Sequence, residues 1–228
     1  IGSVNSKFGE VDILVNNAGT SIRKPPEKLT PEDWKYVMDV NLTSIHYFSS
    51  LIFDQMKNNK GGKIINIGSM MTIFGAGHAS VYAASKGGVV QYSKSCAIAW
   101  AEHNIQVNSI LPGYITTNMT DGFKKNFPKD ADLVTSRIPA GRWGVPDDLA
   151  GTAIFLASSA SDFVTGAFIP VDGGYSIRKL NPKVCFLQVL RLPIHSEHLP
   201  MEFAPKVSCH QAYLSMKKVC LLNRASWL

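Results

Sequence analysis

The chain has 228 residues, of which 45% are hydrophobic and 18% are charged. This composition excludes a disordered or fibrous protein and is typical of one globular domain with a sizeable core. The formal charge of +6 gathers near the end, since residues 1–178 carry 16 Lys/Arg against 15 Asp/Glu and residues 179–228 carry 7 against 2. The basic balance therefore gives no reason to expect a nucleic-acid partner.

The cysteines and the apolar runs bound the cellular context. Cys96, Cys185, Cys209 and Cys220 form no C-x-x-C pair, so we expect no disulfide framework and a reducing, cytoplasmic location. No apolar run reaches the about 18 residues that span a bilayer, so we expect no membrane segment. The Cys and His spacings of the last 50 residues, 179–228, fit no common zinc pattern, and no metal is expected.

The first predicted elements are a strand and a long helix. Residues 10–15 are a short apolar run that predicts a strand, and turn-forming residues follow it as Asn16-Asn17-Ala18-Gly19. Thr30, Pro31 and Asp33 make a well-formed helix start. Apolar residues at helical spacing then predict a helix over residues 31–57, with Asn41 in its middle.

The next two elements carry the strongest chemical signal. Residues 63–67 have the composition of a buried strand, and Ser69 follows at its carboxyl end, where open α/β sheets bind ligands. Tyr82 and Lys86 lie four residues apart on a helix predicted over residues 82–103, so they share one face. An ammonium beside a phenol favours the phenolate, so we expect a lowered Tyr82 pKa and proton transfer near neutral pH. The alternative is an ordinary surface pair.

The remaining pattern completes an α/β fold. We predict a strand over residues 104–111 that ends at Pro112-Gly113, a polar loop over 120–138, a helix over 146–157 and a strand over 168–171. Beyond them, residues 184–190 are strand-like and residues 213–222 suggest a helix. Alternating strands and helices predict a doubly wound, Rossmann-like parallel sheet.

Several of these motifs recur together in one known family. Ser69, Tyr82 and Lys86, with Asn16-Asn17-Ala18-Gly19 upstream and Pro112-Gly113 downstream, resemble the short-chain dehydrogenase/reductase family over residues 9–176. Gly68-Ser69-Met70-Met71 and residues 139–144 are most similar to its sugar-acid branch, which acts on 2-deoxygluconate and 2-dehydro-3-deoxygluconate.

The resemblance implies an activity and a set of roles. The activity is reversible hydride transfer between NAD or NADP and a secondary alcohol or ketone, with a sugar acid as the favoured small-molecule substrate. Ser69 and Tyr82 would bind the substrate oxygen, Lys86 would lower the Tyr82 pKa and bind the nicotinamide ribose, and the Asn41 carbonyl would hold a relay water. The implied cofactor-binding residues are Asn16, Ala18, Gly19, Tyr82, Lys86, Gly113, Ile115 and Thr117. Gluconate 5-dehydrogenase and 3-oxoacyl-carrier-protein reductase activities are the alternatives. Small residues on the helix of Tyr82 imply a homodimer or homotetramer.

One expected feature is missing from the sequence. Family members begin with a strand and a glycine-rich turn that binds the pyrophosphate at a helix N-terminus, and nothing before Asn16 supplies it. We therefore expect residues 1–178 to form a partial domain lacking its first strands, and residues 179–228 to be a tail of unknown structure. The strand at residues 12–15 would then have an open edge, which residues 184–190 would partly cover. The rival hypothesis is a non-catalytic truncated remnant without dinucleotide binding, and the choice between NAD and NADP cannot be read.

Overall fold

The computed structural model describes residues 1–178 and 219–221. The helices in this part are α1 (Gly2–Phe8), α2 (Pro31–Met38), α3 (Ser44–Asn58), α4 (Ser80–Trp100), α5 (Asn118–Asn126), α6 (Pro128–Arg137) and α7 (Asp147–Ala157). The strands are β1 (Ile13–Asn16), β2 (Gly62–Ile67), β3 (Ile105–Pro112), β4 (Phe168–Val171) and β5 (Val219–Leu221). None of these helices is long and apolar enough to cross a membrane.

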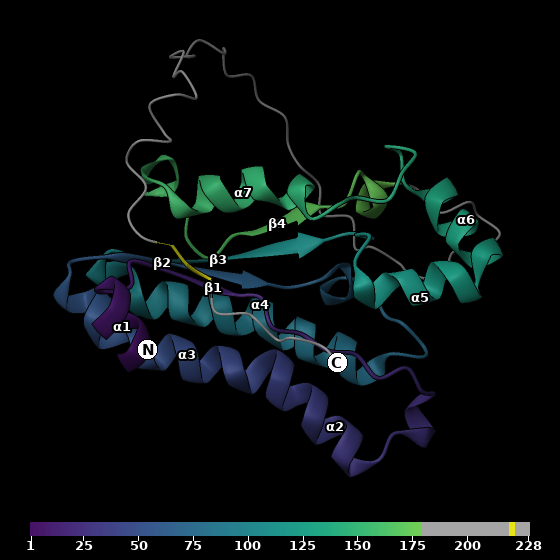
Figure 1. The fold of residues 1–228 in the computed structure, drawn as a ribbon, viewed down its shortest axis with the longest axis horizontal. Helices are drawn as coiled ribbons and strands as arrows, with labels where there is room; N and C mark the ends of the chain where they lie inside the picture. Colours follow the sequence, from purple (N-terminus) through teal and green to yellow (C-terminus); the bar gives the residue numbers. More distant parts are fainter. Residues whose placement is uncertain (179–218, 222–228) are drawn as a thin grey trace, which may run out of the picture.

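The described strands form one parallel sheet in the order β4-β3-β2-β1-β5. Helices cover both faces: α2, α3 and α4 lie on one side of the sheet and α7 lies on the other (Figure 1). Parallel neighbours joined through helices are the arrangement expected for a doubly wound fold. The predicted α/β class and its Rossmann-like sheet are confirmed.

The core is divided between the two faces of the sheet. Successive side chains of a strand point to opposite faces, so Ile64 packs with Leu14 towards α3 and α4 while Ile65 packs with Ile110 towards α7. The carboxyl ends of β1, β2 and β3 all open at one edge, where the predicted site residues lie.

The helix predicted over residues 31–57 begins as expected but is not continuous. Thr30 accepts a hydrogen bond from the Asp33 N–H at 3.2 Å, and Asp33 accepts one from the Thr30 N–H at 3.1 Å. After α2 the backbone widens into a π turn over Asp39–Thr43 before α3 starts. This turn contains Asn41, whose side chain bonds to residues outside the helix, and π turns are frequent at functional sites.

The prediction of a loop over residues 120–138 is wrong, because the chain forms helices α5 and α6 there. Thr117 begins α5, with its N–H donating to the Thr120 hydroxyl at 2.9 Å, and Pro128 occupies the first turn of α6. Only a narrow stripe of these helices packs inward, including Phe123 and Ala131, so their apolar periodicity is weak. The helix predicted over residues 82–103 is confirmed as α4 with shifted ends, followed by a short 3-10 turn at Ala101–His103.

The prediction of a helix over residues 213–222 is wrong for the part that the structure describes, because Val219–Leu221 forms strand β5. It pairs with β1 in parallel, from Ile13 opposite Val219 to Val15 opposite Leu221. Unpaired N–H and C=O groups on an edge strand are a template for another strand, and Val and Leu suit that role. The edge of β1 is therefore paired in this structure, while residues 184–190 lie outside the described part.

Candidate active site

Three predicted catalytic residues meet where β2 ends against α4. Ser69 follows β2 and accepts a hydrogen bond from the Met71 N–H at 3.1 Å, which holds its hydroxyl at the start of a 3-10 turn. Tyr82 is in the first turn of α4, close enough to Ser69 for its pKa to be lowered by hydrogen bonding to that side chain. The Lys86 ammonium lies 5.8 Å from the centre of the Tyr82 ring and donates to the Ile67 carbonyl at 2.7 Å.

The protonation of this group differs from the expectation. Burial raises the pKa of Tyr82, and the opposing effects of Ser69 and Arg23 are smaller. Burial also lowers the pKa of Lys86 to about 8, because a buried ammonium loses its hydration. The predicted lowering of the Tyr82 pKa by Lys86 is therefore wrong for this structure, because burial has the largest effect on both pKa values.

Asn41 is completely buried and ties three segments together. Its amide nitrogen donates to the Thr20 carbonyl and to the Ser85 hydroxyl, each at 2.9 Å, and its oxygen accepts from the Thr20 N–H at 2.8 Å. Ser85 in turn donates to the Tyr82 carbonyl at 2.8 Å. The side chain thus links the π turn to the first turn of α4, and the predicted role of its backbone carbonyl stays a prediction.

The Asn16 to Gly19 turn approaches this group from β1. The Asn16 side chain points into the sheet, where its amide donates to Asn66 at 2.8 Å, so it is used internally. Ala18, which comes two residues later, is half-buried. A Cβ placed on Gly19 would lie 3.5 Å from the Lys86 Nζ and 3.8 Å from the Asn41 Oδ1, so this glycine keeps the space beside the lysine open.

The loop after β3 brings the other predicted cofactor residues to the same edge of the sheet. Gly113 lies against the backbone of Asp172, and a Cβ there would come within 2.6 Å of the Asp172 Cα. Ile115 is buried. The residues on either side of it are hydrogen-bonded to Gly144: the Thr116 N–H donates to the Gly144 carbonyl, and the Gly144 N–H donates to the Tyr114 carbonyl. Thr117 is exposed at the start of α5.

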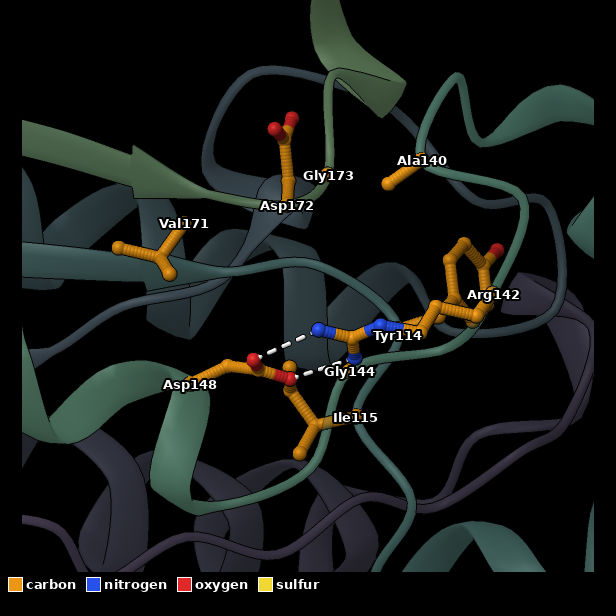
Figure 2. Close-up of a pocket in the computed structure, with 9 residues that line it drawn as sticks. All are labelled: Tyr114, Ile115, Ala140, Arg142, Gly144, Asp148, Val171, Asp172 and Gly173. Carbon is orange, nitrogen blue, oxygen red and sulfur yellow. Dashed lines mark hydrogen bonds and ion pairs between the residues drawn. The ribbon is translucent and has the colours of Figure 1, made fainter.

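A small cavity of about 190 Å³ adjoins this loop (Figure 2). Arg142 crosses its mouth and pairs with both oxygens of Asp148, at 2.7 Å and 2.8 Å, which holds the pKa of that carboxyl well below its usual range. The cavity is lined by Ile115 but by none of Ser69, Tyr82 and Lys86. Arg142 is held at this cavity by its ion pair with Asp148.

The sequence reasoning missed Arg23, which follows the turn after β1. Its guanidinium lies 5.2 Å from the centre of the Phe123 ring, and its charge lowers the pKa of both Tyr82 and Tyr114. The neighbouring Lys24 is paired with Asp33 at 2.5 Å, whereas Arg23 forms no salt bridge within residues 1–178 and 219–221. Arg23 is therefore an exposed cation whose charge acts on Tyr82. The sequence signal that could have identified Arg23 is its position four residues after Gly19, the last residue of the turn that follows β1.

Acidic and metal-ligating side chains do not gather elsewhere in the part of the chain described. Among those residues, no group of three or more His, Cys, Asp or Glu side chains is arranged to hold a metal ion. The side chains at this edge of the sheet include a serine, a tyrosine, a buried lysine and an arginine, a set that can bind a carbonyl oxygen and move a proton to it.

Comparison with known proteins agrees with this geometry. The sequence model of the family described as enoyl-(acyl carrier protein) reductase matches residues 1–176. The chain is 45% identical to 2-dehydro-3-deoxy-D-gluconate 5-dehydrogenase of Dickeya dadantii over 174 residues, which are 76% of this chain and 68% of that protein. It is 42% identical to 5-keto-D-gluconate 5-reductase of Escherichia coli K12 over 171 residues, which are 75% of this chain and 67% of that protein.

A solved structure extends the similarity to three dimensions. The crystal structure of a gluconate 5-dehydrogenase from Burkholderia cenocepacia J2315, in complex with NADP and tartrate, has a TM-score of 0.75 and 39% sequence identity. The match covers 78% of this chain and 69% of that one, so the chain spans about two thirds of the length of such relatives. With Ser69, Tyr82 and Lys86 inside the matched range, the chain belongs to the short-chain dehydrogenase/reductase family.

Proposed function

We propose that this protein interconverts a secondary alcohol and a ketone on a sugar acid, with NAD or NADP as the hydride carrier. The observation that carries the proposal is the meeting of Ser69 and Tyr82 beside the buried ammonium of Lys86. The names of the relatives support the substrate class, since they include dehydrogenases of 2-dehydro-3-deoxy-D-gluconate and of gluconate. Substrates of the 2-deoxygluconate and 2-dehydro-3-deoxygluconate type are favoured, and gluconate 5-dehydrogenase activity is the nearest alternative.

The protein groups would share the proton chemistry. In the direction of ketone reduction, the neutral Tyr82 hydroxyl donates its proton to the substrate oxygen, and the raised pKa of this tyrosine keeps that proton in place beforehand. Ser69 donates a hydrogen bond to the same oxygen as negative charge develops on it. Lys86 then stabilises the phenolate that remains, because its ammonium is held beside the ring.

The residues at the carboxyl ends of β1, β2 and β3 fit the nicotinamide half of a dinucleotide. Gly19 leaves room beside the Lys86 ammonium, which would hold the ribose hydroxyls. Asn16, Ala18 and Gly113 would shape the adjoining wall. The backbone of Ile115 and the hydroxyl of Thr117 would hold the carboxamide. When bound, the dinucleotide supplies or accepts the hydride.

The phosphates of the dinucleotide lack an equivalent site in the part of the chain that is described. A pyrophosphate is commonly bound where a glycine-rich turn leads from a strand into a helix N-terminus. Within residues 1–178 and 219–221, no strand leads into a helix through such a turn. We expect the 228-residue chain to bind NADH and NADPH weakly, and a fluorescence titration tests this. Low-micromolar binding of either nucleotide would contradict the expectation.

Asn41 and the π turn support a proton path behind Lys86. The turn widens the backbone around Asn41, and the side-chain bonds to Thr20 and Ser85 fix its position. We propose that its carbonyl binds a water that exchanges protons with Lys86. Loss of a solvent isotope effect on turnover, when one residue of the π turn is deleted, would support this path.

The charge of the site favours an acid as substrate. Arg23 is exposed, and its charge lowers the pKa of Tyr82, so we propose that its guanidinium binds the carboxylate of the substrate. A neutral acyl thioester would leave this cation unused. This is the physical reason to prefer sugar acids over the 3-oxoacyl-carrier-protein alternative.

A substrate panel followed at the nicotinamide absorbance tests the proposal. The panel contains 2-dehydro-3-deoxygluconate, gluconate, 5-ketogluconate, a neutral sugar alcohol and a 3-oxoacyl thioester, each with both nucleotides. We expect turnover of the acids alone, and its loss in Tyr82→Phe. Turnover confined to the thioester would replace this proposal, and a chain that turns over no substrate would favour the non-catalytic alternative.

The outer face of α3 and α4 supports a homo-oligomer. Tyr47 and Leu51 of α3 and Ile98 of α4 expose 61%, 66% and 83% of their surface, and exposed apolar side chains that gather in one patch mark interaction sites. We propose that this face pairs with a second copy. Light scattering would report a dimer or tetramer for the chain and a smaller species for Leu51→Glu, while Leu133→Glu, a change at an exposed leucine of α6, would leave the mass unchanged.

The free thiol of Cys96 favours a reducing location. Cys96 is buried as a free thiol in α4, and free thiols persist where disulfides are kept reduced. We propose that the protein works in the cytoplasm. Fractionation of cells that express the tagged chain checks this, and recovery in a secreted fraction would contradict it.

A further inference from the structure

A row of buried polar residues crosses the sheet on the face that α3 and α4 cover. Asn16 in β1, Asn66 in β2 and Ser109 in β3 are register partners on neighbouring strands. All three are buried, and Asn66 is 0% exposed. Polar side chains in such a place reduce the apolar area available to the core, so their arrangement calls for a physical reason.

Asn66 is the centre of this row, and both ends of its amide are satisfied. Its oxygen accepts from the Asn16 amide at 2.8 Å, and its nitrogen donates to the Ser93 hydroxyl of α4 at 2.8 Å. Ser93 donates to the Val89 carbonyl at 2.7 Å and accepts from Ser109 at 3.0 Å. Hydrogen bonds thus run without interruption from β1 through β2 into α4.

The same two elements meet a second time at the reaction centre. Lys86 of α4 donates to the carbonyl of Ile67, the residue after Asn66, at 2.7 Å. Lys86 and Ser93 are seven residues apart, so they lie on one side of α4 about two turns from each other. The Asn66–Ser93 and Lys86–Ile67 hydrogen bonds both join α4 to β2. Together they constrain the position of α4 along β2, and this position determines how Tyr82 and Lys86 lie relative to Ser69.

We propose that Asn66 is a positioning residue for the catalytic helix, acting through Ser93 to set the placement of Lys86 and Tyr82 against the end of β2. This inference rests on the proposed function for its consequence in turnover. Asn66 itself touches no reacting group, since Tyr82 precedes Ser93 by eleven residues, or about 16 Å of helix. The competing explanation is that Asn66 only stabilises the core.

Asn108 is a matched control for that competing explanation. It lies on the adjacent strand β3, is 1% exposed and makes two comparable hydrogen bonds, to the Val164 carbonyl at 2.7 Å and from the Ala167 N–H at 2.9 Å. Those partners belong to the segment that leads into β4 and are not residues of α4. Asn66→Ala and Asn108→Ala therefore remove similar buried amides, but only the first removes a hydrogen bond to a residue of α4.

The first measurement does not depend on turnover. In the 228-residue chain, competitive labelling of lysines with acetic anhydride over a range of pH, read by mass spectrometry, reports the pH at which Lys86 becomes reactive. Tyr82 is the titratable side chain whose ring faces Lys86 in the described structure, and it is present in both variants. We expect the reactivity profile of Lys86 to shift in Asn66→Ala and to match wild type in Asn108→Ala, while urea unfolding shows comparable destabilisation of the two.

The second measurement uses the sugar-acid reaction. A displacement of about 1 Å in a catalytic group can cost on the order of a hundredfold in rate, so we expect kcat to fall about tenfold to a hundredfold in Asn66→Ala with KM nearly unchanged. Asn108→Ala should keep the wild-type kcat for the folded fraction. Because Asn66 acts through Ser93, the effects of Asn66→Ala and Ser93→Ala on kcat should fall short of adding in the double variant.

The outcomes separate this inference from the proposed function. Equal Lys86 profiles in the two variants, or an equal loss of kcat in both, would reduce Asn66 to a core residue. If the wild-type chain turns over no sugar acid, the proposed function fails, and the Lys86 labelling comparison still decides whether Asn66 places the helix.

Discussion

The two faces of β2 and β3 are built on different physical terms. On the α4 face, Asn66 and Ser109 form directional hydrogen bonds, whereas on the α7 face their strand neighbours Ile65 and Ile110 make apolar contacts with Leu156. A hydrogen bond contributes about 0.5–1.5 kcal/mol net, and a buried isoleucine about 1.5–3 kcal/mol. Both faces contain apolar core, but at this level of the strands the α7 face is apolar, whereas the α4 face gives up some apolar burial to define where one helix lies.

The largest effect should come from the reacting group on the α4 face. Tyr82→Phe removes the hydroxyl and keeps the ring, so we expect kcat to fall by about 10²–10⁴, the usual contribution of a positioned acid or base. Nucleotide affinity and the free energy of unfolding should change little. Stopped-flow turnover and a nucleotide titration measure the two separately. A variant that loses affinity in proportion to rate would show that Tyr82 is mainly a binding residue.

The next effect concerns the apolar face and should have the opposite character. Ile65→Ala removes buried methyl groups beside Asn66 but on the α7 side, so we expect a loss of about 2–5 kcal/mol in the free energy of unfolding. The kcat of the folded fraction should stay at the wild-type value. Urea unfolding combined with assays at low temperature checks both. A fall in kcat as large as that of Asn66→Ala would abolish the distinction between the faces.

A third prediction uses the pKa of about 8 for Lys86, against an ordinary 10.5. Between these values the unfolded chain binds a proton at this lysine and the folded chain does not, so this group makes stability rise with pH in that window. Relative to Lys86→Met, the wild-type free energy of unfolding should gain up to about 3 kcal/mol from pH 8 to pH 10.5. If the difference in the free energy of unfolding between wild type and Lys86→Met does not change with pH, Lys86 is better solvated than its burial indicates.

The smallest effect tests whether the site extends to the loop after β1. Arg23→Met should raise KM for sugar acids about tenfold to a hundredfold, because a hydrogen bond to a charged group contributes about 1.5–3 kcal/mol. Lys24→Met is the matched control, since that neighbouring cation is already paired with Asp33. An equal change in KM for both variants would point to general attraction of anions by the loop.

What the sequence predicted was local, and what it missed was long-range. Ser69, Tyr82 and Lys86 were found because a strand end and a four-residue spacing suffice to place them. The bond between Asn66 and Ser93 joins residues 27 apart in sequence, and no periodic pattern records it. The direction of the Tyr82 pKa was missed for the same reason, because burial by distant segments outweighs a neighbour on the same helix.

Local signals were also present and undervalued in one segment. Pro128 at the start of α6 and Thr117 before α5 both favour helix N-termini, yet the weak apolar stripe suggested a loop. These helices are stabilised by a few contacts to Trp143 and its neighbours, which the sequence alone does not reveal. Strand β5 depends on the edge of β1, more than 200 residues earlier in the chain.

The π turn between α2 and α3 also sets the rotational phase of the whole helical segment. The residues buried along it, Val37, Asn41, Ile45 and Ser49, follow one another at intervals of four. In a regular α-helix each residue turns the chain by about 100°, so a step of four residues passes one full turn by about 40° and three steps pass three full turns by about 120°. The extra residue of a π turn reduces this rotation by about 100°, so the four side chains stay on nearly the same side of the helix. A single wide turn therefore lets one stripe face the protein interior from Val37 to Ser49. Deleting one residue from Asp39–Thr43 would rotate α2 by about a quarter turn relative to α3 and carry Asn41 away from Thr20 and Ser85.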